Sequence, residues 1–418
     1  ALSADDRYEN FLVEGRLAFY LKGKVQGKYL ITAQADTTEQ RTSDLFTGFF
    51  RADPQDVFRR LDPDAYYPVY GDDSTAVRDV DTQGKLYVRV DWDQNQALWG
   101  NFQTGLTGTE HAQYVRSLYG AALKWRSRES TPLGDPRSEV RVFGSEAQTG
   151  QGHSEFLGTG GSLYYLKHTD ILPGSDQVVL EMRDPTTGRV EARVPLVRDV
   201  DYQVDELQGR LILTRPLMQI SRDNAPSLTR DTPLGGYQNI VLVDYEYISR
   251  GLEYGDLTAG ARGKQWFGDH LAIGATYVDE KRDADDYRLM GVDATLQAGR
   301  GTYIKVEQAR TESTATSVFR SDNGGLSFTR INPEGAREGD AYSAEARANL
   351  RELGYTEREW AMGGWYRDVD RGYSVSRFDL GMPIVEKGAE FAGELSDELS
   401  VSGRLSRAER GLDAFDQA

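Results

Sequence analysis

Apolar and polar residues alternate along most of this chain. In residues 288–298, Met290, Val292 and Leu296 fall on one face, and polar or small residues fall on the other. A Gly-Arg-Gly turn follows at 299–301, and the alternation resumes in residues 302–310. Because successive side chains of a strand point to opposite faces, this pattern predicts a β-hairpin with one apolar and one polar face.

The same unit recurs from residues 15–25 and 28–36 to residues 389–395 and 399–405. Short turns such as 26–27 and 268–269 alternate with longer polar connections such as 280–286 and 312–340. Strands of about ten residues, with short turns on one side and long loops on the other, are typical of membrane-spanning barrels. We therefore predict an all-β protein whose main unit is an antiparallel transmembrane β-barrel. These 418 residues can supply all or only some of the strands of that barrel.

Residues 37–74 break this alternation. Asp53 is a candidate helix N-cap, and Pro54 is a candidate proline at the first helical position. Together they predict a short helix over residues 55–61. We expect this excursion to cap one mouth of the barrel or to lie inside the lumen, because a connection of this length is rarely a bare loop. Its aromatic residues are pore or plug candidates, which either bind a sugar or peptide or anchor the excursion: Phe49, Phe50, Phe58, Tyr66, Tyr67 and Tyr70.

Residues 168–236 form the second exception. Their predicted strands are short and closely spaced, with turn-forming stretches such as 184–188 between them. This spacing indicates a compact β-meander or sandwich, here a small domain inserted into the barrel. The predicted organisation is a first part of the barrel (1–167), the inserted domain (168–236) and a second part of the barrel (237–418).

Net charge, cysteine content and hydropathy narrow the possible partners and membrane segments of the chain. The 418 residues carry a net charge of −17, which argues against nucleic acid as a partner. The absence of cysteine excludes disulfides and thiol chemistry. Mean hydropathy is −0.58 and no run approaches eighteen apolar residues. These values exclude a transmembrane helix but are compatible with a transmembrane β-barrel, because half of each barrel strand is polar.

No motif of an enzyme stands out. The four histidines are far apart in sequence, and nucleophile-elbow, phosphate-loop and HExxH motifs are absent. Asp199, Asp201 and Asp205 are close enough to supply oxygens to Ca²⁺. The alternative is that they cap turns through their own hydrogen bonds. We therefore expect no enzymatic activity and no cofactor other than Ca²⁺ at these aspartates.

Three short stretches carry a resemblance: Tyr-Pro-Val-Tyr-Gly-Asp-Asp-Ser at 67–74, Gln-Gly-Lys-Leu-Tyr-Val-Arg at 83–89 and Leu-Trp-Gly-Asn-Phe at 98–102. The chain resembles the barrel region of very large bacterial outer-membrane surface proteins. Residues 196–216 are also similar to β-repeats of gliding-type secretion translocons. The resemblance implies a barrel in the bacterial outer membrane. The sequence departs from known outer-membrane barrels in two ways. It shows no closing strand that ends on an aromatic residue, and it shows no N-terminal plug domain.

Two functional hypotheses follow. The first is an outer-membrane barrel that anchors a surface assembly or passes an exported chain or solute. Its partners would be outer-membrane lipid and other envelope or surface proteins, and its inserted domain would be periplasmic or lumenal. The second is a secreted soluble all-β protein that binds or cleaves polysaccharide. They differ in where the apolar face of each strand points: toward lipid in the first, into a dry core in the second.

Overall fold

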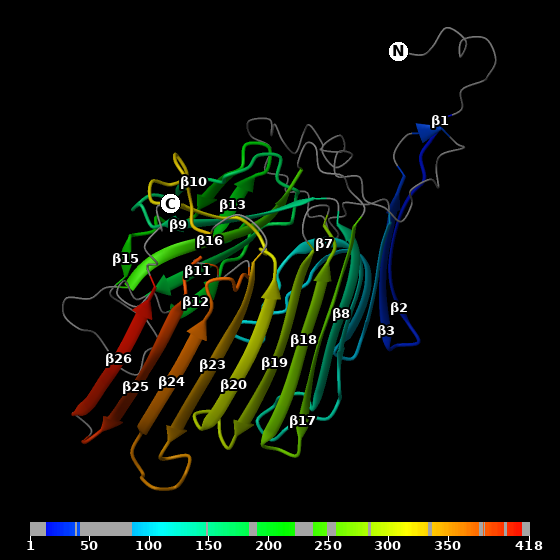
Figure 1. The fold of residues 1–418 in the computed structure, drawn as a ribbon. Coiled ribbons are helices and arrows are strands. Elements are labelled where there is room, and N and C mark those ends of the chain that lie inside the picture. The colour runs from blue at the N-terminus through cyan, green and yellow to red at the C-terminus, as the bar shows by residue number, and fades with distance from the viewer. Residues whose placement is uncertain are drawn as a thin grey trace, which may run out of the picture.

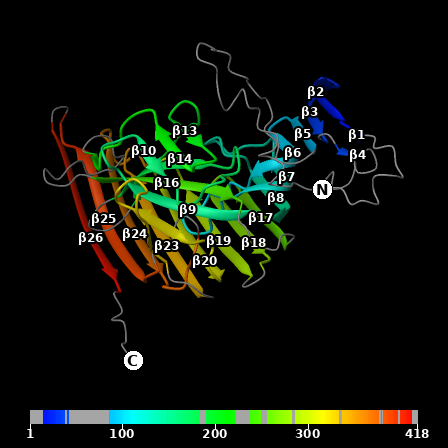
Figure 2. The ribbon, with the colours of Figure 1, turned by 90° about the horizontal axis from the view of Figure 1, so that it is seen from above.

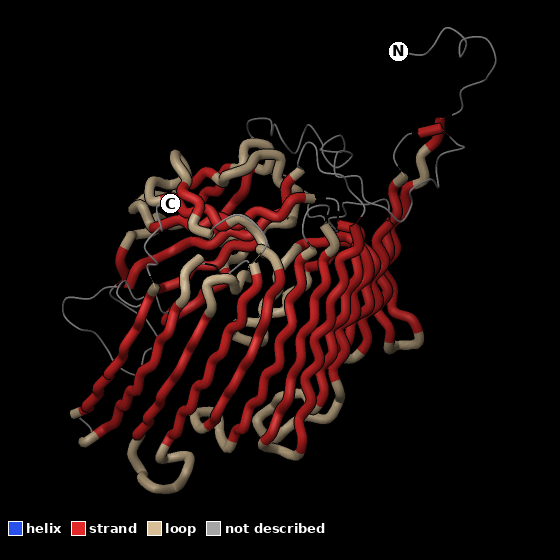
Figure 3. Tube along the Cα trace, viewed as in Figure 1, coloured by secondary structure: helices blue, strands red, loops and turns tan. Residues whose placement is uncertain are grey.

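The computed structural model describes residues 14–37, 40–41, 86–147, 149–183, 190–221, 237–248, 256–282, 286–332, 337–375, 379, 381–396 and 399–411. Every regular element in these ranges is a β-strand (Figure 3), which confirms the prediction of an all-β protein. No helix in this part of the chain could span a membrane. The predicted excursion 37–74, with its helix, falls almost wholly outside the described residues.

The largest element is an antiparallel sheet of fourteen strands, which we call the large sheet (Figure 1). Its order is β2 (Ala18–Val25), β3 (Tyr29–Asp36), β5 (Leu86–Trp92), β6 (Asn95–Gln103), β7 (Ser117–Arg126), β8 (Ser138–Ala147), β17 (Asp256–Phe267), β18 (Leu271–Glu280), β19 (Tyr287–Gln297), β20 (Tyr303–Glu312), β23 (Glu338–Asn349), β24 (Trp360–Val369), β25 (Ile384–Glu394) and β26 (Ser400–Arg410).

The large sheet is an open arc when seen from above (Figure 2). Its two edge strands, β2 and β26, form no pair with each other in the described residues. Neighbouring strands are joined by hairpins whose turns follow the expected chemistry. Gln26 and Gly27, for example, both have positive φ (52° and 66°), as the two-residue turn between β2 and β3 requires.

A second body, the insert, consists of the described residues within 150–247 and of residues 318–330. Its main sheet has the order β12 (Val190–Pro195), β11 (Gln177–Arg183), β16 (Tyr237–Tyr247), β9 (Gly150–Leu157), β21 (Val318–Ser321) and β22 (Thr329–Arg330), with β15 (Ile220–Ser221) paired to β16. A three-stranded sheet of β10 (Leu163–Tyr165), β14 (Arg210–Leu213) and β13 (Tyr202–Asp205) covers it. A separate pair joins β1 (Glu14–Gly15) and β4 (Gln40–Arg41).

The insert is larger than the sequence pattern predicts. Residues 150–157 and 237–247, expected in the barrel, pair with each other as β9 and β16 and belong to the insert. The connection 312–340, expected to be a polar loop, supplies β21, which lies parallel to β9. Residues 373–375 lie outside the named strands, and Tyr373 and Val375 pack into an apolar core. Pairing between distant segments, which alternation alone does not specify, decided these differences.

The two faces of the large sheet have opposite character. The convex face carries exposed apolar side chains on strands from β2 to β26: Phe19, Leu21, Val142, Ile273, Val292, Leu296, Ile304, Met362, Phe391 and Leu405. The alternate positions face inward and are mostly polar or charged. In β18 this produces a strict alternation of exposed and buried residues over almost the whole strand.

The two ends of the large sheet also differ. At one end the strands are joined by connections as short as two residues, and at the other the chain leaves for long segments, including the insert. The insert therefore sits over the end with the long connections (Figure 1). There, part of the inner face is covered by an apolar cluster that includes Phe102, Leu118, Phe143, Tyr287 and Leu289.

Candidate functional site

The connection between β6 and β7, residues 104–116, crosses the inner face of the large sheet; we call it the inner segment. It starts and ends as a narrow ladder, in which Thr104 N–H donates to Arg116 O (3.0 Å) and Leu106 and Tyr114 exchange two backbone hydrogen bonds. Between these ends, the chain reaches strands that are about two hundred residues away in sequence.

One carboxylate holds the tip of the inner segment. Glu307, on β20, accepts hydrogen bonds from the backbone N–H groups of Glu110 (2.7 Å), His111 (2.9 Å) and Ala112 (2.7 Å). Three successive N–H groups that converge in this way form a concave anion site in the backbone. Because the acceptor is ionised, each of these hydrogen bonds is stronger than a neutral one. Glu307 therefore fixes the height at which the segment crosses the sheet.

Close packing supports the same position. A Cβ added to Gly291 on β19 would lie 2.4 Å from the Cβ of Ala112, so only glycine lets the segment approach the sheet this closely. The Tyr373 hydroxyl donates to His111 O at 2.8 Å from the far side. Burial lowers the pKa of His111 to about 4, so its ring is neutral at pH 7. The segment is therefore packed and hydrogen-bonded on both sides.

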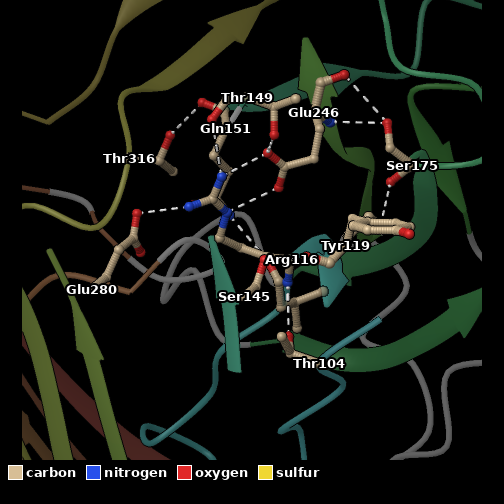
Figure 4. A network of polar contacts seen from close by, with 12 residues as sticks. Thr104, Arg116, Tyr119, Ser145, Thr149, Gln151, Ser175, Glu246, Glu280 and Thr316 are labelled. Atoms are coloured by element: carbon tan, nitrogen blue, oxygen red, sulfur yellow. Dashed lines mark hydrogen bonds and ion pairs between the residues drawn. The ribbon is translucent and has the colours of Figure 1, made fainter. Parts of the chain in front are cut away.

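The inner segment ends at a buried arginine that joins three parts of the molecule (Figure 4). Arg116 donates from Nε and Nη2 to both carboxylate oxygens of Glu246 on β16 (2.9 and 2.7 Å), and from Nη1 to Glu280 on β18 (2.7 Å). The Tyr114 hydroxyl donates to the second oxygen of Glu280 at 2.8 Å. The insert, the large sheet and the inner segment thus meet at one side chain.

The charge on Arg116 is secured by its neighbours. Burial opposes this charge, but Glu246 and Glu280 outweigh it and hold the pKa of Arg116 well above its usual range. Both Arg116 and Glu246 have side chains that are only 2% exposed. Removing one partner of such a buried pair leaves an uncompensated charge, which is costly. The network therefore locks the position of the insert on the large sheet.

Below the tip of the inner segment lies a cavity of about 420 Å³. Its wall is the inner face of β17, β19, β20 and β23, and its roof is formed by Gly108, Thr109 and Glu110. The lining is rich in charged side chains of both signs, among them Lys264, Asp293, Lys305 and Glu345. A polar cavity between an inward segment and a charged sheet face is suited to binding or passing a small polar solute.

The insert carries a second buried charge network, away from this cavity. His153 Nδ1 lies 2.6 Å from Asp244 Oδ1, and its Nε2 lies 3.9 Å from Glu155. Arg183 donates to both oxygens of Glu155 at 3.0 and 3.1 Å. Burial disfavours a charged ring, but Asp244 and Glu155 outweigh it and raise the pKa of His153 to about 9. The imidazolium is therefore a structural cation at neutral pH.

The aspartates singled out from the sequence lie in turns of the insert. Asp201 accepts a hydrogen bond from Val197 N–H (2.8 Å), and Asp205 accepts one from Gln208 N–H (3.1 Å). Asp199 has a positive φ of 63°, as turn residues of this type often do. In the described part of the chain, no group of three His, Asp or Glu residues could hold a metal ion. The structure thus gives each aspartate a role in a turn and does not bring them together.

The aromatic candidates Phe49, Phe50, Phe58, Tyr66, Tyr67 and Tyr70 lie outside the described residues. The sequence did not single out the residues that hold the inner segment in place, which are Arg116, Glu246, Glu280 and Glu307. Each sits in a segment whose local pattern is ordinary. The one available signal was the presence of Ala112, Tyr114 and Val115 in the connection between two strands, which indicates that this connection is buried.

Comparison with known proteins adds little. No family model matches the chain, and no curated protein matches its sequence. Among solved structures, one match is the crystal structure of Pseudomonas aeruginosa OccK10 (OpdN), at 12% identity and a TM-score of 0.26. The match covers 95% of this chain and 87% of that chain. A likeness at that TM-score is too slight to support an argument, so the functional reasoning below rests on the described residues.

Proposed function

We propose that the large sheet is the wall of a β-barrel in a bacterial outer membrane, and that it surrounds a passage for a small solute narrowed by the inner segment. The observation that carries this proposal is the exposed apolar convex face. Soluble proteins rarely leave large contiguous apolar surfaces open to water. In lipid the same surface is favourable, because the hydrocarbon layer takes the place of a core.

A belt of charges borders the apolar band on the convex face. Asp279, Arg288 and Glu312 stand opposite one another on β18, β19 and β20, where Arg288 pairs with both acids (3.4 and 3.0 Å). Arg310 on β20 pairs with Glu338 and Asp340 on β23. Such a belt is expected where strands leave hydrocarbon for the polar headgroup layer.

The belt does not follow one row of paired residues. On β19 it begins at Arg288, whereas on β24 it begins at Asp368, which shares a row with Tyr342, Gln308 and the apolar Val292. The boundary thus moves toward the short-turn end by four paired positions, which are two positions on the convex face, between these strands. Barrel strands are tilted by roughly 35–45° to the membrane normal, so a membrane plane must cross the rows at an angle. The shift supports a tilted, membrane-spanning sheet.

Lipid also sets a condition on the edges of the sheet. Backbone N–H and C=O groups that face hydrocarbon must be hydrogen-bonded, because no water is present to satisfy them. We therefore infer that β2 and β26 are both paired in the membrane. The long connections of outer-membrane barrels face outward. The insert, which was expected to be periplasmic or lumenal, would then lie on the outer surface of the cell.

Two adjacent residues on β2 provide the test. Leu21 on the convex face and Tyr20 on the concave face are similarly exposed, 55% and 50%. A Leu21→Arg change should lower the free energy of unfolding in lipid vesicles by about 2–4 kcal/mol if it places the charge near the bilayer midplane, and Tyr20→Arg should change it much less. Conductance of the wild-type protein in a planar bilayer then tests the passage.

Two outcomes would contradict the proposal. Wild-type protein that stays monodisperse in buffer without detergent would exclude the membrane sheet. Membrane-inserted protein that conducts no ions would leave the anchor hypothesis in place of the passage.

A further inference from the structure

Charges on the concave face of β20 to β26 are paired across neighbouring strands. Residues in directly opposite positions carry opposite charges: Lys305 and Glu345, Arg367 and Glu386, and Glu390 and Arg404. Opposite charges in such positions stabilise a sheet, whereas like charges destabilise it. Asp293 and Glu307, which lie opposite each other on β19 and β20, face Arg262 and the three N–H groups of the inner segment. This half of the concave face therefore offsets most of its own charges.

The concave face of β5 to β8 is different, because its cations outnumber its acids. We call its charged residues the basic wall, which consists of Arg89, Lys124, Arg126 and Arg141 with Asp91 and Glu139. Arg89 pairs with Asp91 at 2.7 Å. Glu139 Oε1 is shared by Arg126 and Arg141, at 3.3 and 2.8 Å. Two acids thus face four cations, and the wall has an excess of positive charge.

Lys124 is the centre of the basic wall. It lies directly opposite Arg141 on β8, and Arg141 in turn lies opposite Arg262 on β17. Three cations therefore follow one another along one row of the sheet. The ionised groups that act on Lys124 are Arg141, Arg89 and Arg126, all of them cations. The side chain of Lys124 is exposed, and among the described residues no carboxylate lies within ion-pair distance of it.

The inner segment is attached to the same wall. Arg141 Nη1 donates to Gly105 O at 2.8 Å. Gly108 lies against Arg262, since a Cβ added to this glycine would lie 3.3 Å from Nε of the arginine. The narrowing that the inner segment forms is therefore bordered by cations on one side. Fixed charges of one sign beside a low-dielectric wall concentrate ions of the opposite sign.

We propose that the basic wall makes the passage selective for small anions, with Lys124 as a specificity-determining residue. Arg and Lys side chains that line a pore favour anions, because they replace part of the stabilisation that the ion loses with its water. This selectivity rests on the proposed passage and names the class of solute that the passage favours.

The permeability ratio of chloride to potassium tests the proposal, and it is obtained from the reversal potential of the full chain in a planar bilayer. In a gradient centred on about 0.1 M KCl, charges act over about 10 Å, and we expect chloride to cross at least about threefold more readily than potassium. Near about 1 M KCl this range falls to about 3 Å, so the ratio should fall toward about one.

Variants of Lys124 connect the ratio to the basic wall. Lys124→Glu reverses one charge and should lower the ratio at least about twofold, whereas Lys124→Arg keeps the charge and should retain the ratio. Lys387→Gln removes an exposed cation from the convex face and should leave the ratio unchanged. Because the side chain of Lys124 is exposed, its replacement should not impair folding.

The two proposals fail in different ways. Wild-type protein that conducts but prefers potassium, or a Lys124→Glu variant that keeps the wild-type ratio, would overturn the role of the basic wall and leave the passage in place. Protein that inserts into the bilayer but does not conduct would overturn both.

Discussion

The large sheet and the insert use the same kinds of residue in opposite ways. The insert buries its apolar side chains, and Phe156, Tyr164, Ile171, Leu211 and Val241 are fully enclosed between its two sheets. The large sheet exposes its apolar side chains on the convex face and turns charges toward its concave face. The first arrangement is that of a domain in water, and the second suits a sheet surrounded by lipid. The solvent of each region can therefore be inferred from its burial pattern.

The largest expected effect lies where the two regions meet. Arg116→Met would leave Glu246 buried without its ion-pair partner and Glu280 with Arg282 as its remaining cation, so we expect a loss of about 3–5 kcal/mol in the free energy of unfolding. Hydrogen exchange should show faster exchange in β16 and the inner segment together. The exposed pair between Arg128 and Asp93 provides the control, because exposed ion pairs contribute little. Independent behaviour of the two segments would contradict the junction role.

Truncating one apolar residue in each region tests the contrast directly. Phe156→Ala in the insert should cost about 3–5 kcal/mol, because it removes buried contacts and leaves a cavity. Leu296→Ala on the convex face should cost less than about 1.5 kcal/mol in detergent, since amphiphile can fill the space. Denaturation followed separately in insert and sheet measures both. Equal costs would mean that the convex face is packed against protein.

A smaller effect is expected from releasing the inner segment. Glu307→Gln keeps the shape of the side chain but removes its charge and one acceptor oxygen, which should weaken the attachment of residues 110–112 by about 1.5–3 kcal/mol. The amides of these residues should exchange faster, and conductance should rise. Glu312→Gln, on the same strand but on the convex face, should change neither. An unchanged exchange rate would contradict the tether.

The last prediction concerns pH and affects the insert alone. The folded insert raises the pKa of His153 from its ordinary value near 6.5 to about 9. The stability that it contributes is therefore fully present below pH 6.5 and is lost as pH rises through 9. Unfolding of the insert, followed from pH 6 to pH 10, should show this loss. The Asp244→Asn variant, which removes the main partner, should flatten it, and the large sheet should not respond.

Local pattern predicted most of the large sheet. The hairpins of β2–β3, β17–β18 and β19–β20 follow from alternation and from their turn residues, because both act over a few neighbouring positions. The candidate site was not predictable in this way. Glu307 looks like any polar residue of a half-buried strand, and its three hydrogen bonds come from a segment about two hundred residues earlier. A pattern of period two contains no information about such a partner.

The sequence alone thus determined that this protein is built of antiparallel strands with one apolar and one polar face, since side-chain direction in a strand is a local property. Tertiary structure decided which strands belong to which sheet. It assigned residues 150–157 and 318–321 to the insert, laid residues 104–116 across the inner face, and gathered Arg116, Glu246 and Glu280 at one junction. These outcomes depend on chain segments that meet over long separations, where the free energy of pairing and burial, and not local preference, selects the partner.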